Sequence, residues 1–406
     1  MTNRGFDPAS GDEGHADGDR RDRRPLDRVA ERAGVASVTD GGVVIFEDGE
    51  RLVFNSMNFL GLTADERVQR AATEAAVTVG TGSGGPRGAG GDTLVHHDLE
   101  QRIARTIGCE RTLVFPSRFQ TLVSTLYALD PDVVFGGVRY LQSVASSMPT
   151  GTTVVPYPDG DFTALEARLD ERDGSDPNAS ESWLVIAESI DRLDGTTGNL
   201  TRLVELATDA GAWTLVDESA AIGLFADGGG VIRAEGLEDR VDVQIGSLGT
   251  ALASQGGYVG ADAAVIELIA TSNGFIETGA ITPVAAATAT EALHVARFGD
   301  HRDRLWENVR HFNDGLAAMG IDVPGDSPVL VVPVGSDVDA RDVVEAMAER
   351  GVLVRSMGNG QAAHRSASSH DRLVITPMAT HESSDVVACL EAIQDVFVEF
   401  GLLASQ

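Results

Sequence analysis

Residues 213–223 read WTLVDESAAIG. The apolar run Trp213–Val216 predicts a buried β-strand, and the acidic Asp217 follows it directly. A helical pattern at Asn199–Ala210 precedes this strand, and another apolar strand pattern, Trp183–Ala187, precedes that helix. Because a strand, a helix and a strand in this order favour a parallel βαβ unit, we expect Asp217 at the carboxyl edge of a parallel sheet. Ligands usually bind at that edge.

The same alternation continues in both directions from this unit. Toward the N-terminus the patterns predict strands at 112–115 and 153–155 and helices at 68–79, 94–107, 121–129 and 162–169. Toward the C-terminus a single long helix is expected over 282–318, followed by strands near 329–334, 353–355 and 373–375 and helices at 340–350 and 384–400. This order predicts an α/β protein with a mainly parallel sheet covered by helices on both faces.

The sequence divides into four expected segments. Residues 1–28 are rich in Gly, Asp and Arg and predict a disordered tail. Residues 29–60 contain two short β runs around a glycine turn, which predict a hairpin. We expect a large domain over 61–290 and a smaller C-terminal domain over 291–406, with the long helix as the bridge between them.

The composition excludes several classes of partner and is unusual in having no lysine. The chain has 62 acidic and 31 basic residues, a net charge of −31, and every basic Lys+Arg residue is arginine. Such a negative field disfavours nucleic acid and anionic membranes, and the acidic, lysine-free composition predicts a halophile's cytoplasmic protein. No apolar run is long enough for a membrane span, and the N-terminus does not resemble a signal peptide. Cys109 and Cys389 alone predict neither a disulfide framework nor a zinc site.

Five motifs follow one another in order between residues 58 and 259, and the similarity that they carry covers roughly residues 40 to 400. They are Asn58–Leu62 (NFLGL), Gly80–Glu100 (GTGSGGPRGAGGDTLVHHDLE), Glu188-Ser189 with Asp194-Gly195, Asp217–Gly223, and Gly246–Val259 (GSLGTALASQGGYV). Together they resemble the α-oxoamine synthases, pyridoxal phosphate (PLP) enzymes of the aminotransferase class I/II type that condense an amino acid with an acyl-CoA. The glycine-rich motif is most similar to serine palmitoyltransferase. The resemblance implies a fold-type I transferase, with a mainly parallel seven-stranded sheet in the large domain and a smaller C-terminal α/β domain.

The resemblance also implies site residues. Asp217 matches the family aspartate that pairs with the pyridinium nitrogen of PLP, and Ser247 and Thr278 match positions facing the cofactor phosphate. Ser117 and Phe119 match the Ser-Gly-aromatic loop beside that phosphate. Pro86, Arg87 and Gly88 belong to a loop that, in serine palmitoyltransferase, reaches the active site of the partner subunit in a dimer.

Five departures from the family pattern fall on the residues that carry its chemistry. Thr250 stands at the position of the lysine that binds PLP, and Ala220 stands at the position of the histidine that contacts it. Arg118 replaces the glycine of the phosphate loop, Val374 replaces an arginine that engages the substrate carboxylate, and no His-Ala-Ser occurs near 140–143. Because guanidinium stays protonated and is not a nucleophile, no arginine can replace the lysine. Covalent PLP binding is therefore impossible in this chain.

Several residues keep two interpretations. Asp217 is a cofactor ligand or a structural carboxylate, and Arg118 is a surface residue or fills the former phosphate pocket and pairs with a retained carboxylate. The Gly80–Gly91 loop is a glycine-rich turn in a solvated loop or an ordered loop that reaches the site of a partner subunit. The histidines show no metal-ligand spacing and predict surface or core positions.

Three functions remain open. The first is a non-catalytic subunit that supports a lysine-bearing paralogue, as the lysine-lacking first subunit of serine palmitoyltransferase does. The second is a transferase that holds PLP non-covalently or uses altered chemistry. The third is a homodimeric protein that binds a small molecule near Asp217.

Overall fold

The computed structural model describes residues 35–38, 43–46, 49–173, 181–191, 194–323, 325, 327–335, 337–357 and 371–404. The expected tail, 1–28, lies outside these residues. Strand β2 (Val43–Phe46) pairs antiparallel with β3 (Gly49–Val53), which confirms the hairpin, and β1 (Val35–Val38) pairs with β2.

The central sheet has seven strands in the order β4-β10-β9-β8-β7-β5-β6. Their bounds are β4 Arg111–Phe115, β5 Val133–Gly137, β6 Thr153–Tyr157, β7 Trp183–Glu188, β8 Trp213–Asp217, β9 Val243–Ser247 and β10 Gly257–Ala261. The strands from β9 to β6 are parallel, whereas β10 runs antiparallel to both β9 and β4. The expected mainly parallel, seven-stranded sheet is confirmed.

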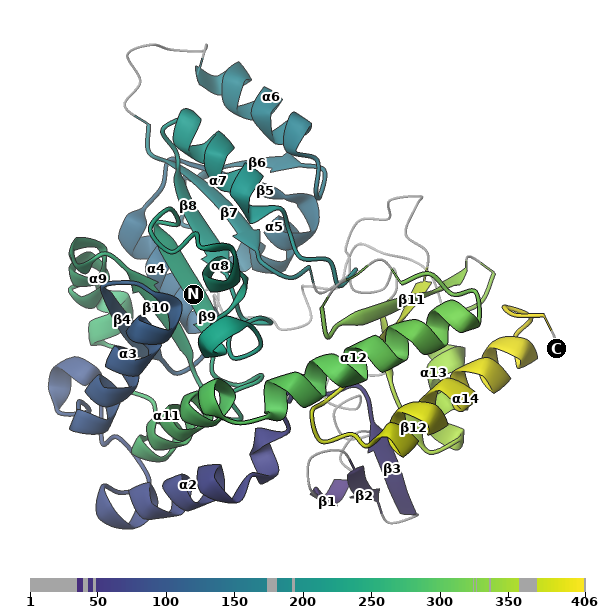
Figure 1. The fold of residues 1–406 in the computed structure, drawn as a ribbon. Helices are drawn as coiled ribbons and strands as arrows, with labels where there is room; N and C mark the ends of the chain where they lie inside the picture. The colour runs from purple at the N-terminus through teal and green to yellow at the C-terminus, as the bar shows by residue number, and fades with distance from the viewer. Residues whose placement is uncertain are drawn as a thin grey trace, which may run out of the picture.

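Helices cover both faces of this sheet (Figure 1). On one face lie α4 (Arg118–Leu129), α5 (Val138–Val144), α9 (Ala263–Ala270) and α10 (Asn273–Ile276). On the other lie α3 (Leu94–Ile107), α6 (Phe162–Asp173), α7 (Leu200–Asp209), α8 (Val231–Glu235) and α11 (Pro283–Phe298), with α2 (Glu66–Thr78) packed on α11. Successive strand residues point to opposite faces, so Leu215 and Val216 of β8 belong to the two different cores.

The single helix expected over 282–318 is wrong. The chain forms α11 and then α12 (His301–Ala318), because Gly299 adopts extended backbone, with φ −85° and ψ 174°, and ends the first helix. Helix α11 packs on α2 and α3, whereas α12 packs on α14 (Ser383–Glu399). The boundary expected at 290/291 therefore falls inside α11, and the break at 299–300 separates helices that pack on different domains.

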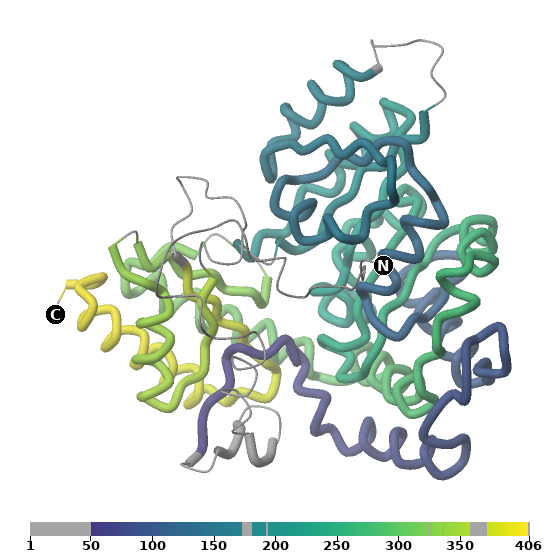
Figure 2. The backbone as a smooth tube through the Cα atoms, turned by 180° about the vertical axis from the view of Figure 1, so that it is seen from behind, coloured from purple at the N-terminus to yellow at the C-terminus, as the bar shows by residue number. Residues whose placement is uncertain are grey.

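The smaller C-terminal domain pairs with the N-terminal hairpin through one strand. Its sheet has the order β11-β14-β13, with bounds Leu330–Gly335, Asp371–Ile375 and Arg355–Met357, covered by α12, α13 (Ala340–Glu349) and α14. The single strand expected near 353–355 is wrong, because β12 (Val352–Leu353) pairs instead with β3 of the N-terminal hairpin. Figure 2 shows this purple N-terminal strand beside the green and yellow C-terminal elements.

Several buried strands were absent from the sequence expectations, namely β5, β9 and β10. Short apolar runs buried on both faces show no alternation of polar and apolar residues, so periodicity does not find them. In the part of the chain that the structure describes, no helix has the length and apolar character needed to cross a membrane.

Candidate functional site

Asp217 ends β8 at the carboxyl edge of the sheet, as expected, and its side chain is already surrounded by donors. The residue is 3% exposed. Its Oδ1 accepts the Ser219 backbone N–H at 2.9 Å, and its Oδ2 accepts the Arg118 Nε–H at 2.8 Å and the Tyr140 hydroxyl at 3.0 Å. Donors on three separate segments thus converge on one carboxylate.

Arg118 is the first residue of α4, whose N-terminus is capped by Ser117. The Ser117 Oγ accepts the Gln120 backbone N–H at 3.1 Å. The Arg118 guanidinium contacts Asp217 Oδ2 through Nη2 as well as Nε, and it lies 5.9 Å from the centre of the Tyr140 ring. Although burial acts to lower it, the Asp217 carboxylate holds the pKa of Arg118 above its ordinary value. The interpretation in which Arg118 pairs with a retained carboxylate is confirmed.

Thr250 and Ala220, the residues that the resemblance assigns to the family lysine and histidine, contribute no ionisable group. Thr250 lies in the turn after β9, and its hydroxyl donates to the Ser219 backbone oxygen at 2.8 Å. Ala220 is 5% exposed and belongs to the core. Val374, in β14, is fully buried.

The residues expected to face a phosphate lie around the start of α4. Ser247 pairs across the sheet with Gly257, where an added Cβ would lie 2.8 Å from the Arg118 backbone nitrogen. The Thr278 hydroxyl donates to the Gly274 backbone oxygen at 2.6 Å and accepts from Gln120 Nε2 at 3.2 Å. The Ser247 Oγ accepts the Gly249 backbone N–H at 3.1 Å. Gln120 links Ser117 and Thr278, and the hydroxyl groups of Ser117, Thr278 and Ser247 are each engaged within the chain. Phe119 points toward solvent, with 52% exposure.

The Gly80–Gly91 loop makes specific contacts within its own chain, although most of its residues are at least partly exposed. Pro86 forms an antiparallel bridge with Gly279, and Gly88 lies against Ile276. The Arg87 guanidinium donates to both oxygens of Glu100, at 2.8 and 3.2 Å, and its Nε lies 2.6 Å from Asp92. With its side chain 6% exposed, Arg87 acts inside its own chain here, and contact with a partner's site stays a prediction.

Two further residues of this site were not singled out from the sequence. Tyr140 follows β5, a strand that the patterns missed, so its place at the carboxyl edge was hidden. Glu218 is buried beside Asp217, and its Oε1 accepts the Ile232 backbone N–H at 3.2 Å. Burial raises the pKa of Glu218 to about 7. Its only sequence signal was its place directly after Asp217.

The residues present do not fit PLP bound as the resemblance implies. A pyridinium nitrogen would have to pair with Asp217, but Arg118 already supplies a cation there, and Tyr140 supplies a third N–H or O–H donor to the same oxygen. Thr250 offers a hydroxyl instead of an amine. The described residues also contain no group of three or more side chains arranged to hold a metal ion.

Comparison with known proteins places the chain in a family. The family model described as aminotransferase class I and II matches residues 50–393. The 8-amino-7-oxononanoate synthase of Anaeromyxobacter sp. (strain K) is 33% identical over 383 residues, which cover 92% of this chain and 93% of that relative. The serine palmitoyltransferase of Sphingobacterium spiritivorum is 27% identical over 371 residues, 89% of this chain and 90% of the relative.

Solved structures share the fold over nearly the whole chain. Sphingomonas wittichii serine palmitoyltransferase superposes with a TM-score of 0.83 at 22% identity, over 93% of this chain and 98% of that one. A high-resolution structure of SPT with PLP also has a TM-score of 0.83, at 24% identity, over 94% of this chain and 100% of that one. PLP is accordingly the cofactor expected of the family. The chain belongs to the aminotransferase class I and II family, within its α-oxoamine synthase branch.

Proposed function

We propose that this chain is a non-catalytic α-oxoamine synthase homologue that acts as a partner subunit of a lysine-bearing paralogue. The contact between Arg118 and Asp217 carries the proposal, because it places a protein cation on the carboxylate expected to receive the pyridinium nitrogen. Thr250 adds to it, since a hydroxyl bonded to a backbone oxygen provides neither a nucleophilic amine nor a base.

The missing lysine removes two separate contributions to catalysis. In this family it binds the cofactor covalently and then moves the proton at the substrate α-carbon. General acid–base help alone is typically worth about 10² to 10⁴-fold in rate. Glu218 is a buried ionisable group beside Asp217, but backbone N–H groups of α8 hold its carboxylate. It therefore does not replace the lysine amine.

The two alternatives have less support. Non-covalent PLP would have to displace Arg118 from a carboxylate whose side chain is 2% exposed. A small-molecule pocket around Asp217 would need the same displacement. By contrast, the subunit role needs no such displacement, and the loop at 80–91, which resembles the serine palmitoyltransferase loop, is held in the chain by the bridge from Pro86 to Gly279.

The first test is spectroscopic. The full chain, purified in concentrated KCl with added PLP, is expected to retain no absorbance band at roughly 410–430 nm, the region where protonated Schiff bases of PLP absorb, and no borohydride-reducible adduct. A lysine-bearing paralogue treated in the same way is the positive control.

The second test concerns the partner. Mixed with the paralogue, the chain is expected to form a heterodimer on size-exclusion chromatography and to raise the condensation rate of the paralogue. PLP-dependent condensation by the pure chain would overturn the non-catalytic assignment. A stable homodimer indifferent to the paralogue would overturn the subunit role alone.

A further inference from the structure

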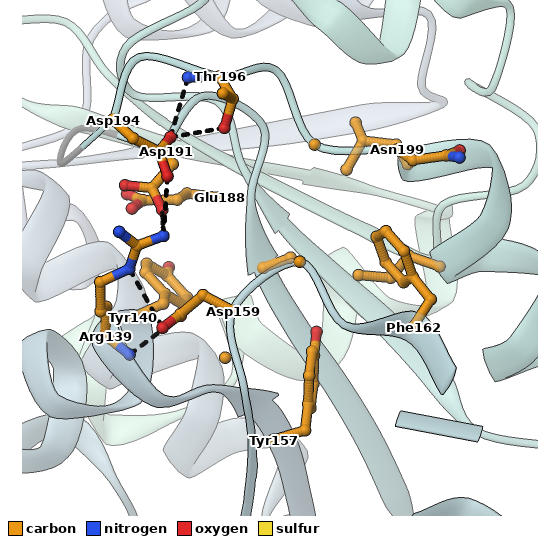
Figure 3. A pocket seen from close by; sticks show the side chains of 16 residues that line it. Arg139, Tyr140, Tyr157, Asp159, Phe162, Glu188, Asp191, Asp194, Thr196 and Asn199 are labelled. Carbon is orange, nitrogen blue, oxygen red and sulfur yellow. Dashed lines mark hydrogen bonds and ion pairs between the residues drawn. The ribbon is translucent and has the colours of Figure 1, made fainter. Parts of the chain in front are cut away.

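A cavity lies at the carboxyl edge of the same sheet, beside the site of Asp217. It has a volume of about 130 Å³ and is bounded by the ends of β5, β6 and β7 and by the starts of α6 and α7 (Figure 3). A cavity of about 150 Å³ accepts a molecule the size of benzene. This one therefore suits a ligand of about five or six non-hydrogen atoms.

The walls of the cavity differ in chemistry. One wall is apolar and contains Phe162, Leu200 and Leu203. The opposite wall is charged, and the described lining residues carry four carboxylates and one guanidinium: Asp159, Glu188, Asp191, Asp194 and Arg139. The lining thus favours a ligand that is positively charged at one end and apolar at the other.

Arg139 does not make the cavity an anion site, because its guanidinium is already bound by carboxylates. Its Nε lies 3.1 Å from Asp159, and its Nη2 lies 2.5 Å from Asp191 and 3.0 Å from Asp194. The Arg139 backbone N–H also donates to Asp159 Oδ1 at 3.1 Å. These contacts hold the acidic wall in place, as the dashed lines of Figure 3 show. An anion entering the cavity would have to compete with all three carboxylates.

Tyr157 provides an independent sign of a ligand. It ends β6 and is 4% exposed, and its hydroxyl points into the cavity between the two walls (Figure 3). That hydroxyl makes no hydrogen bond to any residue that the structure describes. The side chain is buried, but the hydroxyl oxygen itself opens onto the cavity, so a ligand there can reach it. Burial, with the Asp159 carboxylate nearby, raises the pKa of Tyr157 well above its ordinary value, so the group stays a neutral phenol that can accept or donate a hydrogen bond.

We propose that this cavity binds a small organic cation, a primary amine with a short apolar chain. The ammonium group faces Asp159 and its neighbouring carboxylates and donates one N–H to the Tyr157 hydroxyl, while the chain packs against Phe162 and Leu203. The proposal does not depend on the subunit role, because no hydrogen bond or ion pair joins Tyr157 or Asp159 to Asp217 among the described residues, although Glu188 lies opposite Asp217 in the β7–β8 ladder. Tyr140 links the two places, since it lines the cavity and bonds Asp217 from the other side.

The test uses three probes of the same chain length: n-butylamine, butan-1-ol and butyrate. Isothermal titration of the full chain in KCl is expected to give one site for the amine, with binding at least about tenfold tighter than for the alcohol and none for butyrate. Tyr157→Phe is expected to weaken the binding of n-butylamine about three- to tenfold, because one hydrogen bond to the ligand is lost. Asp159→Asn is expected to weaken the binding of n-butylamine by a similar factor.

Two exposed residues provide matched controls, Tyr127→Phe and Asp98→Asn, with 56% exposure of Tyr127 and 52% of the Asp98 side chain. Both are expected to bind the amine as the original chain does. Equal affinity for amine and alcohol, tighter binding of butyrate, or loss of binding in the control variants would overturn the proposal. So would unchanged amine affinity in Tyr157→Phe.

Thermal unfolding separates ligand binding from a purely structural role. Without a probe, Tyr157→Phe is expected to melt no lower than the original chain, because its hydroxyl has no partner to lose. With saturating n-butylamine, the melting temperature of the original chain should rise, since the ligand binds the folded state only, and that of Tyr157→Phe should rise less. A variant that is destabilised without ligand and stabilised equally with it would assign Tyr157 a packing role instead.

Discussion

Arg118 and Asp217 are 99 residues apart in the chain, yet their contact determines which charge the site can accept. Glycine at position 118, as in the family pattern, would leave the carboxylate open to a cation from outside. With arginine there, the cation is part of the protein. Removing one partner of a buried ion pair leaves a buried charge without compensation, which destabilises the fold more than replacing both partners with apolar residues. Removing either Arg118 or Asp217 alone should therefore lower the stability of the folded chain as well as change binding.

The double variant Arg118→Gly with Thr250→Lys tests this directly. It frees Asp217 and supplies the missing amine, and it is expected to retain PLP with a borohydride-reducible band. Thr250→Lys alone should retain at least about tenfold less cofactor, because Arg118 still occupies the carboxylate. Absorbance after gel filtration, with Thr250→Ser as the control, measures the difference. Equal retention by the single lysine variant would show that Arg118 does not block the site.

Glu218 makes the stability of the folded chain depend on pH. Burial raises its pKa from 4.5 to about 7, so the folded state binds the proton more tightly than the unfolded state. The stability contributed by the protonated form is therefore complete below about pH 4.5 and is lost as the pH rises through about 7.

Glu218→Gln keeps an oxygen for the Ile232 N–H and removes the titration. Between about pH 4.5 and 7.5, the free energy of unfolding of the original chain should fall relative to this variant by about 3 kcal/mol. Urea unfolding across this pH range measures it. Parallel curves for the two proteins would rule out a titrating Glu218.

Among the secondary-structure elements, the 80–91 loop depends on close backbone packing. A Cβ on Gly91 would lie 2.0 Å from the Gly85 backbone oxygen, whereas a Cβ on Gly82 would meet nothing within 4 Å. The bridge from Pro86 to Gly279 and the ion pairs of Arg87 both depend on this conformation.

Gly91→Ala is accordingly expected to lower the free energy of unfolding by about 1–3 kcal/mol, the usual cost of overpacking, and to weaken heterodimer formation. Gly82→Ala, the matched control, should change stability by less than about 0.5 kcal/mol. Thermal unfolding and size-exclusion chromatography with the paralogue check the two effects. If Gly91→Ala lowered stability but left the heterodimer intact, the loop would have no part in the interface.

For the whole molecule, the net charge of −31 governs behaviour in salt. Mutual repulsion of surface carboxylates destabilises the compact state, and the screening length falls from about 10 Å at 0.1 M to about 3 Å at 1 M. The melting temperature is expected to rise by at least about 5 °C over this range of KCl, a shift worth about 4 kcal/mol in a chain of this size. Sorbitol at equal osmolality is the uncharged control. A flat or falling melting temperature in KCl would contradict a halophilic origin.

Much of this molecule could be predicted from its sequence. The motif order indicated the family, and the alternation of strands and helices indicated the sheet with Asp217 at its edge. Strands β5, β9 and β10 were missed, as was the break before His301. These features leave weak local signals, because a strand buried on both faces has no polar period and one extended glycine can end a helix.

The identity of a residue needs no coordinates, so the absence of lysine, the threonine at 250 and the alanine at 220 are established before any folding is considered. The roles of the remaining groups follow from the folded arrangement. That arrangement brings Arg118 from the start of α4 onto Asp217 at the end of β8, and it points the Tyr157 hydroxyl into a cavity where none of the described residues bonds it. The physical reason is that such contacts join segments far apart in the chain, and their geometry follows from how the sheet and helices pack.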